Sequence, residues 1–419
     1  MPNARDATRP DLIHVAARNP NWTRHATVRR RANVIPVAAS SVDFDVVVVG
    51  ARCAGAATAL LLARRGLRVL AIDRGRYGSD TVSTHALMRA GVVQLSRWGV
   101  LEGIKAAGTP AVRSTSFHYG DEVVAVQIKP HHDIDGLYAP RRTVLDRLLC
   151  DAAQQAGAAI MFETQLVDLV RADDGRVSGV RLKDGHDRER QVSAELVIGA
   201  DGVRSTVARL VGSERYRTGR HATGVVFSYW SGPAFDGYHW YYNPGVSAGA
   251  IPTNDGLTCI FASVPQRRFH ETMRHGTDAG YRHVLRECAS DLAAVVEQSE
   301  RVEKFRGFSG ETGFFRQSFG PGWALVGDAG YFKDPLTAHG ITDALIDAEL
   351  LAQAAAVGTE AAFAGYQSAR DKLAVAHFEV TDAVASFEWD LPTVQQLHRA
   401  LSDEMKKESL AATSFAMPA

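Results

Sequence analysis

Residues 43–73 read DFDVVVVGARCAGAATALLLARRGLRVLAID, and this stretch decides the fold. The apolar run Val46–Val49 ends abruptly at Gly50, and a helical pattern rich in Ala and Leu follows. A second apolar run, Arg68–Ile72, then ends in Asp73. The order is strand, tight turn, helix, strand and acid, which is the outline of a dinucleotide-binding unit. The sequence therefore predicts an α/β core with a dinucleotide at its first turn.

The residues of this unit have separate physical tasks. Gly50 allows the sharp turn, and Gly55 allows the helix and strand to pack closely. The helix N-terminus offers unpaired N–H groups and a positive dipole to a pyrophosphate. The carboxylate of Asp73 can accept hydrogen bonds from a ribose hydroxyl. The residues predicted to bind the dinucleotide here are Gly50, Ala51, Arg52, Cys53, Gly55, Ala56, Asp73 and Arg74.

Arg52 departs from the G-x-G-x-x-G pattern, because it stands where the middle glycine is expected. Its guanidinium could reach a phosphate, and a charge-assisted hydrogen bond is worth about 1.5–3 kcal/mol. It could equally point to solvent beside the turn. Both interpretations stay open from the sequence.

The composition excludes several classes of protein. The chain has 419 residues with a formal net charge of zero, which argues against general nucleic-acid binding. No window reaches about 18 uninterrupted apolar residues, so no membrane span is expected. The cysteines Cys53, Cys150, Cys259 and Cys288 show no C-x-x-C spacing, so neither a zinc site nor a disulfide framework is predicted. No metal site is expected, and a reduced cytoplasmic setting fits best.

Residues 1–42 differ from the rest because they are rich in arginine and lack periodic apolar positions. They contain no apolar core of the kind that a secretory signal needs. Their arginine-rich, acid-poor composition also allows a transit peptide, but a disordered leader outside the fold is the simpler prediction.

Strand and helix patterns follow the first unit along the chain. Helices are predicted over 87–107, 142–157, 270–298 and 340–356, with a helical tail to about 408, and strands over 114–119, 122–128, 159–170, 176–183, 191–198 and 323–326. The two strands 176–183 and 191–198 should form a hairpin across a polar turn. Residues 224–263 read as aromatic strands.

Three separated motifs together indicate a family. The first is the turn at Gly50–Gly55 with Asp73, the second is Ala200–Ser205 (ADGVRS), and the third is Gly327–Ala329 (GDA) with Asp334-Pro335. In this order they resemble the flavoprotein hydroxylase superfamily with the para-hydroxybenzoate hydroxylase fold. That superfamily includes geranylgeranyl reductase-like and flavin halogenase branches, and the resemblance covers roughly residues 43–375.

The resemblance implies an α/β fold with a Rossmann-like FAD-binding domain, an inserted and mostly antiparallel β-sheet substrate domain, and a helical C-terminus. The implied FAD-binding domain is discontinuous and comprises 43–112, 140–215 and 305–360. The implied substrate domain comprises 113–139 and 216–304, and 361–419 form the C-terminal helices.

The resemblance also assigns roles to particular residues. Asp328 would accept hydrogen bonds from the ribitol chain, although a plain helix N-cap is the alternative. The helix at Gly340 would point N–H dipoles at the pyrimidine edge of the flavin. Asp201 would serve both FAD and the nicotinamide, or would only cap a turn. Arg142 would lie near the phosphates, with Arg141 as the competing candidate. The other implied FAD-binding residues are Thr84, Leu166, Gly327, Pro335 and Ile341.

The third motif departs from the family's usual G-D-A-A-H, because residues 327–333 read GDAGYFK. The following loop, 336–341, reads LTAHGI, where glycines are commoner in the family. His339 would then lie near the flavin ring, and so would His85 in the segment Ser83–His85. Both are candidate catalytic residues, and an ordinary structural role is the alternative for each.

The function that the resemblance implies is hydroxylation of an aromatic or other apolar small molecule by a C4a-hydroperoxyflavin, with molecular oxygen as co-substrate and NADPH or NADH as transient reductant. The aromatic strands at 225–242 would form one wall of the pocket, unless they are core packing. One alternative is a reductase or dehydrogenase of an isoprenoid-like substrate. A halogenase is disfavoured, because residues 239–244 read HWYYNP and not W-x-W-x-I-P. A non-catalytic flavin-binding protein is the remaining alternative.

Overall fold

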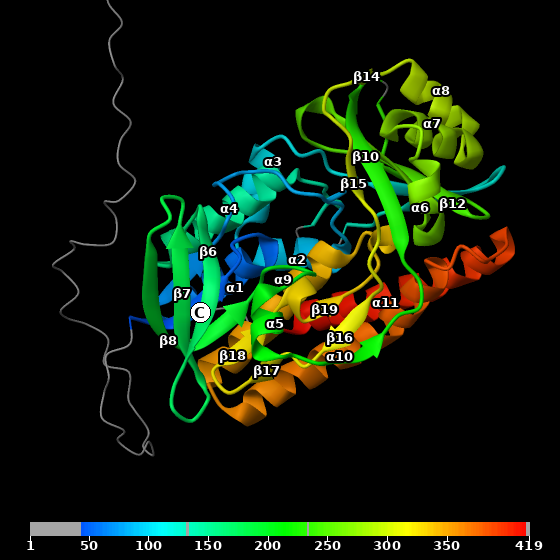
Figure 1. Ribbon diagram of the computed structural model, residues 1–419. Helices are drawn as coiled ribbons and strands as arrows, with labels where there is room; N and C mark the ends of the chain where they lie inside the picture. The colour runs from blue at the N-terminus through cyan, green and yellow to red at the C-terminus, as the bar shows by residue number, and fades with distance from the viewer. Residues whose placement is uncertain (1–42, 131–133, 233, 416–419) are drawn as a thin grey trace, which may run out of the picture. The chain divides into compact units, whose positions relative to one another are not determined.

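A mixed sheet is built around the stretch 43–73, and its strands β6, β7, β8 and β18 are labelled at the lower left of Figure 1. The computed structural model describes residues 43–130, 134–232 and 234–415. The sheet runs in the order β17-β18-β8-β1-β2-β5, and β7 and β6 extend it as a hairpin beside β8. Its strands are β1 (Phe44–Val49), β2 (Val69–Ile72), β5 (Ala159–Met161), β6 (Thr164–Arg171), β7 (Val177–Asp184), β8 (Glu189–Gly199), β17 (Phe319–Gly320) and β18 (Trp323–Leu325).

Strand β8 joins the parallel and antiparallel parts of this sheet. Its C-terminal half pairs parallel with β1, where Val48 lies opposite Ile198, and with β18 on its other side. Its N-terminal half pairs antiparallel with β7, which confirms the predicted hairpin. Three strands therefore end next to one another at Val49, Gly199 and Leu325. Each is followed within two residues by one of the three motifs.

Helix α1 (Cys53–Arg64) connects β1 to β2 and packs against α4 (Arg142–Gln155) and α9 (Gly340–Val357). Most of α1 is buried, and Leu60, Leu61 and Leu62 are fully so. The other buried residues of α1 are mostly alanine and glycine, and their small side chains let α4 and α9 pack closely against it. The short α5 (Thr206–Val211) follows β8.

A second sheet runs in the order β14-β10-β13-β12-β11-β3-β4, with β15 beside β10. All its pairs are antiparallel except β11 with β3. Its strands are β3 (Ser114–Tyr119), β4 (Glu122–Gln127), β10 (Thr223–Ser231), β11 (Tyr238–Asn243), β12 (Val246–Pro252), β13 (Thr258–Pro265), β14 (Glu300–Arg301) and β15 (Arg306–Phe308). Three helices accompany it, α6 (Gln266–Thr272), α7 (Thr277–Cys288) and α8 (Ser290–Glu297), and a 3₁₀ turn η1 (Asn254–Gly256) precedes β13.

The two faces of the second sheet belong to different cores. Val226 and Trp230 of β10 pack in a cluster with Tyr281 and Leu285 of α7. Phe227, next to Val226 along the same strand, belongs to the large core that also contains α1. This alternation is the period of two that a strand buried on both sides requires.

The remaining elements complete the described chain. A small third sheet contains β9 (Arg215–Thr218), β16 (Phe314–Arg316) and β19 (Tyr331–Phe332). Figure 1 shows the long helices α10 and α11, in orange and red. The other helical elements are α2 (Arg89–Arg97), α3 (Leu101–Ala106), α10 (Glu360–Val384), α11 (Leu391–Ser414), η2 (Gly327–Ala329) and η3 (Pro335–Thr337). Among the helices of the described residues, none has the length and apolarity that crossing a bilayer demands.

The α/β fold is confirmed, and several predicted elements prove to be interrupted. The helix predicted over 87–107 breaks into α2 and α3 at Gly99, whose φ is +74°. The strand predicted over 159–170 breaks at Glu163, with φ +52°, so β5 pairs with β2 and β6 with β7. The helix predicted over 270–298 is three helices, with a break at Gly276 at φ +110°. A positive φ stops either regular structure, and an apolar pattern does not reveal it. The leader predicted over 1–42 lies outside the described residues.

Candidate functional site

The turn between β1 and α1 is held from both sides. Gly50 adopts φ +103°, and a Cβ on Gly55 would lie 1.8 Å from the Gly50 carbonyl oxygen. The carboxylate of Asp73 accepts hydrogen bonds from the N–H of Ala51 at 2.9 Å and of Gly75 at 2.7 Å. The glycines therefore bring the strand and the helix into direct backbone contact, and the hydrogen bond from Ala51 to Asp73 holds the turn in place.

The N-terminus of α1 is open to an anion. No side chain caps it, and its first turn holds no acidic residue. Arg52 precedes it and donates hydrogen bonds to the carbonyl of Ser79 at 3.0 Å and to Asp146 at 3.3 Å. The side chain of Arg52 is 30% exposed, so it lies at the edge of the site with protein groups on one side and solvent on the other. A hollow of about 220 Å³ lies here, lined by Ala51, Arg52, Asp73, Arg76, Gly78, Ser79, Asp146, Cys150 and Phe162.

The third motif lies directly against this turn. A Cβ on Gly327 would come within 3.0 Å of the Cβ of Ala54 in the first turn of α1. The N–H of Gly327 donates to Asp347 at 2.7 Å, so Asp347 and not Asp328 holds the turn. Asp328 is partly exposed and accepts no hydrogen bond from the residues that the structure describes. Burial, with Asp343 nearby, raises the pKa of Asp328 to about 7. An unpaired acceptor of this kind suits a ligand that offers hydroxyl groups.

Arg142 lies between these two motifs and is buried. Its Nε donates to Asp146 at 3.0 Å, and its Nη2 lies 3.6 Å from the Cys53 sulfur. Burial acts to lower the pKa of Arg142, but the carboxylate of Asp146 outweighs it and holds the pKa above its usual range. Burial raises the pKa of Cys53 to about 11, so it stays a thiol. The surface position considered for Arg142 is therefore wrong.

A second hollow of about 300 Å³ separates the loop after the third motif from the second sheet. Its lining is mostly apolar and comprises Thr84, Thr223, Val225, Trp240, Phe261, Ser263, Pro335, Leu336 and Ala338. Ala338 adopts φ +51°, a conformation that favours glycine, at the place where the sequence departs from the family's glycines. A Cβ on Gly340 would meet nothing within 4 Å, and no side chain caps α9 there.

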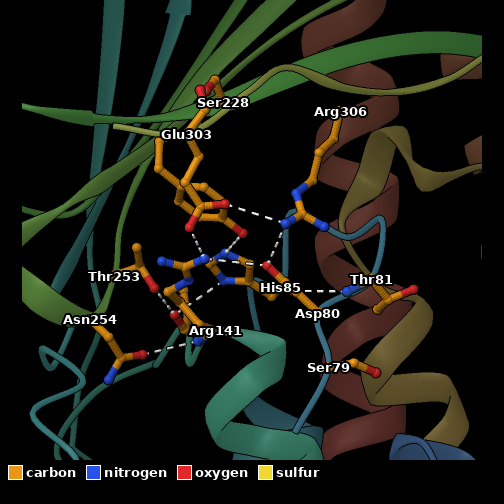
Figure 2. A network of polar contacts seen from close by, with 12 residues as sticks. Ser79, Asp80, Thr81, His85, Arg141, Ser228, Thr253, Asn254, Glu303 and Arg306 are labelled. Atoms are coloured by element: carbon orange, nitrogen blue, oxygen red, sulfur yellow. Dashed lines mark hydrogen bonds and ion pairs between the residues drawn. The ribbon is translucent and has the colours of Figure 1, made fainter. Parts of the chain in front are cut away.

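The loop that carries Thr84 is fastened to the second sheet by a polar network (Figure 2). Asp80 lies 3.2 Å from Arg141 and 3.0 Å from Arg306. Glu303 pairs with the same two arginines, at 3.3 Å for Arg306. The guanidinium of Arg141 also lies 4.2 Å from the ring centroid of Tyr229. Arg141 therefore joins loop and sheet, whereas Arg142 beside it in sequence faces the first motif.

His85 belongs to the same network. Its Nδ1 lies 3.1 Å from the carbonyl of Ala139, and its Nε2 lies 3.1 Å from the hydroxyl of Tyr229. Burial lowers the pKa of His85 to about 3, so the ring is neutral at physiological pH. Thr84 lines the apolar hollow and His85 does not.

His339 lies in a buried polar cluster away from the lining of the hollow. Its Nε2 pairs with Glu408 of α11, and Lys333 pairs with Asp343 at 3.0 Å next to it. The ring of His377 is tilted against that of His339, with centroids 4.3 Å apart. Burial and Lys333 lower the pKa of His339 to about 3, and burial raises the pKa of Glu408 to about 7.

This cluster also offers ligand atoms of His339, His377 and Glu408 within 4.8 Å of one another. The ammonium of Lys333 lies against the same groups, and Glu408 is already paired with His339. A cation would have to displace that pair and would be repelled by Lys333. The arrangement is therefore better described as an internal polar network.

The other predicted residues lie in several places. The carboxylate of Asp201 accepts hydrogen bonds from the N–H groups of Thr206 and Val207, so it caps α5. Burial raises the pKa of Asp201. Leu166 lies on β6 and packs against the cluster of side chains around β7 and β8. Ala56 and Ile341 are buried, and Arg74 is exposed.

The aromatic strands serve both of the roles considered for them. Val225 and Trp240 line the apolar hollow, whereas Trp230 and Tyr241 pack on the helical side of the sheet. Thr223, Phe261, Ser263 and Leu336 were not singled out from the sequence. Strand alternation could have found the first three, since Thr223 alternates with Val225 along β10 and Phe261 with Ser263 along β13, whereas Leu336 lies in the turn after the third motif. No sequence signal identifies the pairing of Asp80 with Arg306, because the two lie far apart in the chain.

Comparisons with known proteins agree with this geometry. A family model described as FAD binding domain matches residues 43–377. Menaquinone reductase of Mycolicibacterium smegmatis is 28% identical over 358 residues, which are 80% of this chain and 81% of that protein. Digeranylgeranylglycerophospholipid reductase of Methanothrix thermoacetophila is 27% identical over 75% of this chain and 79% of that protein.

A hydroxylase and a halogenase are also similar. Aklavinone 12-hydroxylase RdmE of Streptomyces purpurascens is 31% identical over 238 residues, which are 51% of this chain and 44% of that protein. The solved structure of the flavin-dependent brominase Bmp2 superposes with a TM-score of 0.73 at 18% identity, over 90% of this chain and 96% of that one. At that identity the likeness concerns the fold alone.

Proposed function

This chain belongs to the FAD binding domain family and is an FAD-dependent oxidoreductase, and on that premise we propose that its reaction is the hydroxylation of a small aromatic or other apolar molecule. The reductant would be NADPH or NADH, and the oxidant molecular oxygen. The observation that carries the proposal is the apolar hollow of about 300 Å³ between the third-motif loop and the aromatic sheet. Its lining is mostly apolar with a few polar side chains, which is the composition typical of sites for small apolar molecules.

The residues present fit FAD. The uncapped α1 N-terminus and Arg52 would hold the pyrophosphate, and Asp73 the ribose. Asp328, whose carboxylate has no hydrogen-bonding partner among the described residues, would hold the ribitol hydroxyls. The open space at Gly340 and the uncapped α9 N-terminus would accept the electron-rich edge of the ring. When bound, this group supplies the transfer of reducing equivalents and the activation of oxygen.

The chain's own residues would orient the substrate and exclude water. Trp240 and Phe261 offer aromatic surface on one side of the hollow, and Leu336 offers apolar surface on the other. Thr84, Thr223 and Ser263 are the polar side chains in its lining, and they would fix the orientation of a substrate hydroxyl or carbonyl. A dry, apolar wall also protects reactive intermediates from water.

A reductase of an isoprenoid-like or quinone substrate is the second candidate. It is favoured by the two reductases that match about three quarters or more of both chains, whereas the hydroxylase matches about half of this one. A long chain would need to leave the hollow through its open side. Reduction of such a substrate needs no oxygen.

Oxygen dependence separates the two candidates. Hydroxylation consumes one O₂ and one NAD(P)H for each substrate hydroxylated and releases one water. A panel of small phenols and quinones would be tested with NADPH and NADH, in air and in an anaerobic chamber. We expect substrate-dependent NAD(P)H oxidation in air with a product 16 mass units heavier, and none without oxygen. Turnover that continues anaerobically, with a product heavier by two hydrogens, would replace the hydroxylase by the reductase.

We propose a cytoplasmic location from the state of the cysteines. All four cysteines are buried and unpaired by disulfides, which suits a reducing compartment.

A further inference from the structure

Strand β4 is an open and apolar edge of the second sheet. In the described part of the chain it pairs with β3 alone and is last in the strand order. All six of its residues are exposed, and Val123, Val124 and Val126 are 54%, 39% and 44% exposed. Proteins usually protect such an edge with lysine, proline or a bulge, and Glu122–Gln127 contains none of these. An edge of this kind is a template for another strand.

The backbone shows which residues would pair there. In the β3–β4 ladder Ser114 lies opposite Gln127, and one step further the N–H of Ile128 donates to the carbonyl of Arg113 at 2.8 Å. In an antiparallel ladder the groups of alternate residues point to opposite sides. The even-numbered residues of β4 therefore bond to β3, and the N–H and C=O groups of Val123, Ala125 and Gln127 point to the open edge.

We propose that two copies of this chain form a symmetric dimer by pairing their β4 strands antiparallel about an axis through Ala125. A two-fold axis perpendicular to the sheet keeps each residue on its own face, so it pairs residues whose numbers are both odd or both even. The axis at Ala125 places Val124 opposite Val126 of the second copy. It also brings Asp121, in the turn before β4, to the end of the paired strands where Lys129 of the second copy follows its β4.

Charge complementarity selects this register. An axis one residue earlier, at Val124, would bring Asp121 to the end of the strand near Gln127, and one residue later, at Val126, would bring Lys129 near Val123. The register at Ala125 opposes unlike charges, and symmetry makes that contact twice. It also buries the exposed valines against one another, as an isologous interface requires. The second sheet becomes continuous across the dimer.

The first experiment measures the mass of the full-length chain by light scattering over a range of concentrations. We expect a dimer that dissociates on dilution. Lys129→Asp would oppose two pairs of like charges and should raise the dissociation constant by about fivefold or more. The double variant Asp121→Lys, Lys129→Asp restores the complementarity and should return the constant to that of the wild type. Flavin content checks that each variant folds, because these residues lie outside the candidate site.

A cross-link tests the register itself. Ala125→Cys would place two thiols directly opposite each other, with Cα atoms about 5.5 Å apart, within reach of a disulfide. Gln127→Cys is the matched control on the same edge, since its copy would lie about 13 Å away. The four native cysteines are buried and do not interfere. We expect mild oxidation to link the first variant and not the second.

Two results would overturn the proposal. A chain that stays monomeric at every concentration would mean that β4 is left open or is covered by something else, such as residues 1–42. A dimer whose dissociation constant is unchanged in the charge variants, and in which Ala125→Cys is no more readily cross-linked than Gln127→Cys, would place the interface elsewhere.

Discussion

Replacing Asp328 by Asn should raise the stability of the flavin-free protein and lower its affinity for FAD. Asp328 has no hydrogen-bonding partner among the described residues, and burial with Asp343 nearby raises its pKa from 3.8 to about 7. Because the folded pKa lies above the unfolded one, the stability linked to this group is complete below about pH 4 and is lost as the pH rises to about 7.

The size of the effect follows from the shift. Raising the pKa of a carboxyl group from 3.8 to about 7 on folding lowers the free energy of unfolding by about 4 kcal/mol above pH 7 and by about 2 kcal/mol at pH 5. These are upper values, because Asp328 is partly exposed and water screens its charge. An amide cannot ionise, so the flavin-free Asp328→Asn chain should be more stable than the wild type, and the gain should grow from pH 5 to pH 8.

Affinity for FAD should change in the opposite direction. A neutral amide oxygen accepts a weaker hydrogen bond than a carboxylate, by about 1 kcal/mol, which is about fivefold in the dissociation constant. Asp328→Ala removes the acceptor and should cost more. Urea unfolding of the flavin-free protein at the two pH values and titration with FAD measure both effects. Asp173→Asn, in the exposed turn between β6 and β7, is the control. A variant with unchanged stability at pH 8 and unchanged FAD affinity would refute the reasoning.

Three further changes test other parts of the site. Gly55→Ala would place a Cβ 1.8 Å from the carbonyl oxygen of Gly50 and should give insoluble or flavin-free protein. The control Gly365→Ala has nothing within 4 Å of its new Cβ, and it should stabilise α10 by about 0.5–1 kcal/mol, as measured by urea unfolding. Arg52→Ala should weaken FAD binding by about 1–3 kcal/mol, and an unchanged titration would remove Arg52 from the phosphate site. Glu408→Ala should lower the free energy of unfolding by about 1–3 kcal/mol, because it leaves the buried His339 ring nitrogen without its partner. Glu408→Gln should recover most of this loss. Equal losses in both variants would mean that the pairing itself contributes little.

Local signals in the sequence predicted the centre of the fold well. The strand, turn, helix and acid of 43–73 were predictable because each part is encoded within a few residues, and the β7–β8 hairpin was predictable for the same reason. The breaks at Gly99 and Glu163 were not, because they depend on single backbone dihedrals that an apolar pattern does not reveal.

The candidate site divides in the same way. The motif residues Gly327 and Asp328 were found because they follow a short buried strand directly. The direction of a side chain depends on contacts between distant segments, and this decided which of Arg141 and Arg142 faces the first motif. It also turned His339 toward Glu408, a residue 69 positions further along the chain.

That last contact explains why the loop after the third motif can dispense with glycine. Ala338 in a left-handed conformation costs about 1–2 kcal/mol relative to glycine. A buried hydrogen bond to a charged group contributes about 1.5–3 kcal/mol, which offsets the strain at the neighbouring residue. The partner comes from α11, which lies beyond the part of the chain that the family model matches. A glycine-rich loop would be free to move, whereas this loop is held by the C-terminal helix, so the position of Pro335–Ala338 in the wall of the hollow depends on residues outside the FAD-binding motifs. Exchanging Ala338 for Gly should therefore stabilise the protein by about 1–2 kcal/mol where Glu408 holds the loop in this conformation, and by less in a Glu408→Ala chain whose loop can relax. Urea unfolding of the four chains measures the difference, and an equal gain in both backgrounds would mean that Glu408 does not hold the strained conformation.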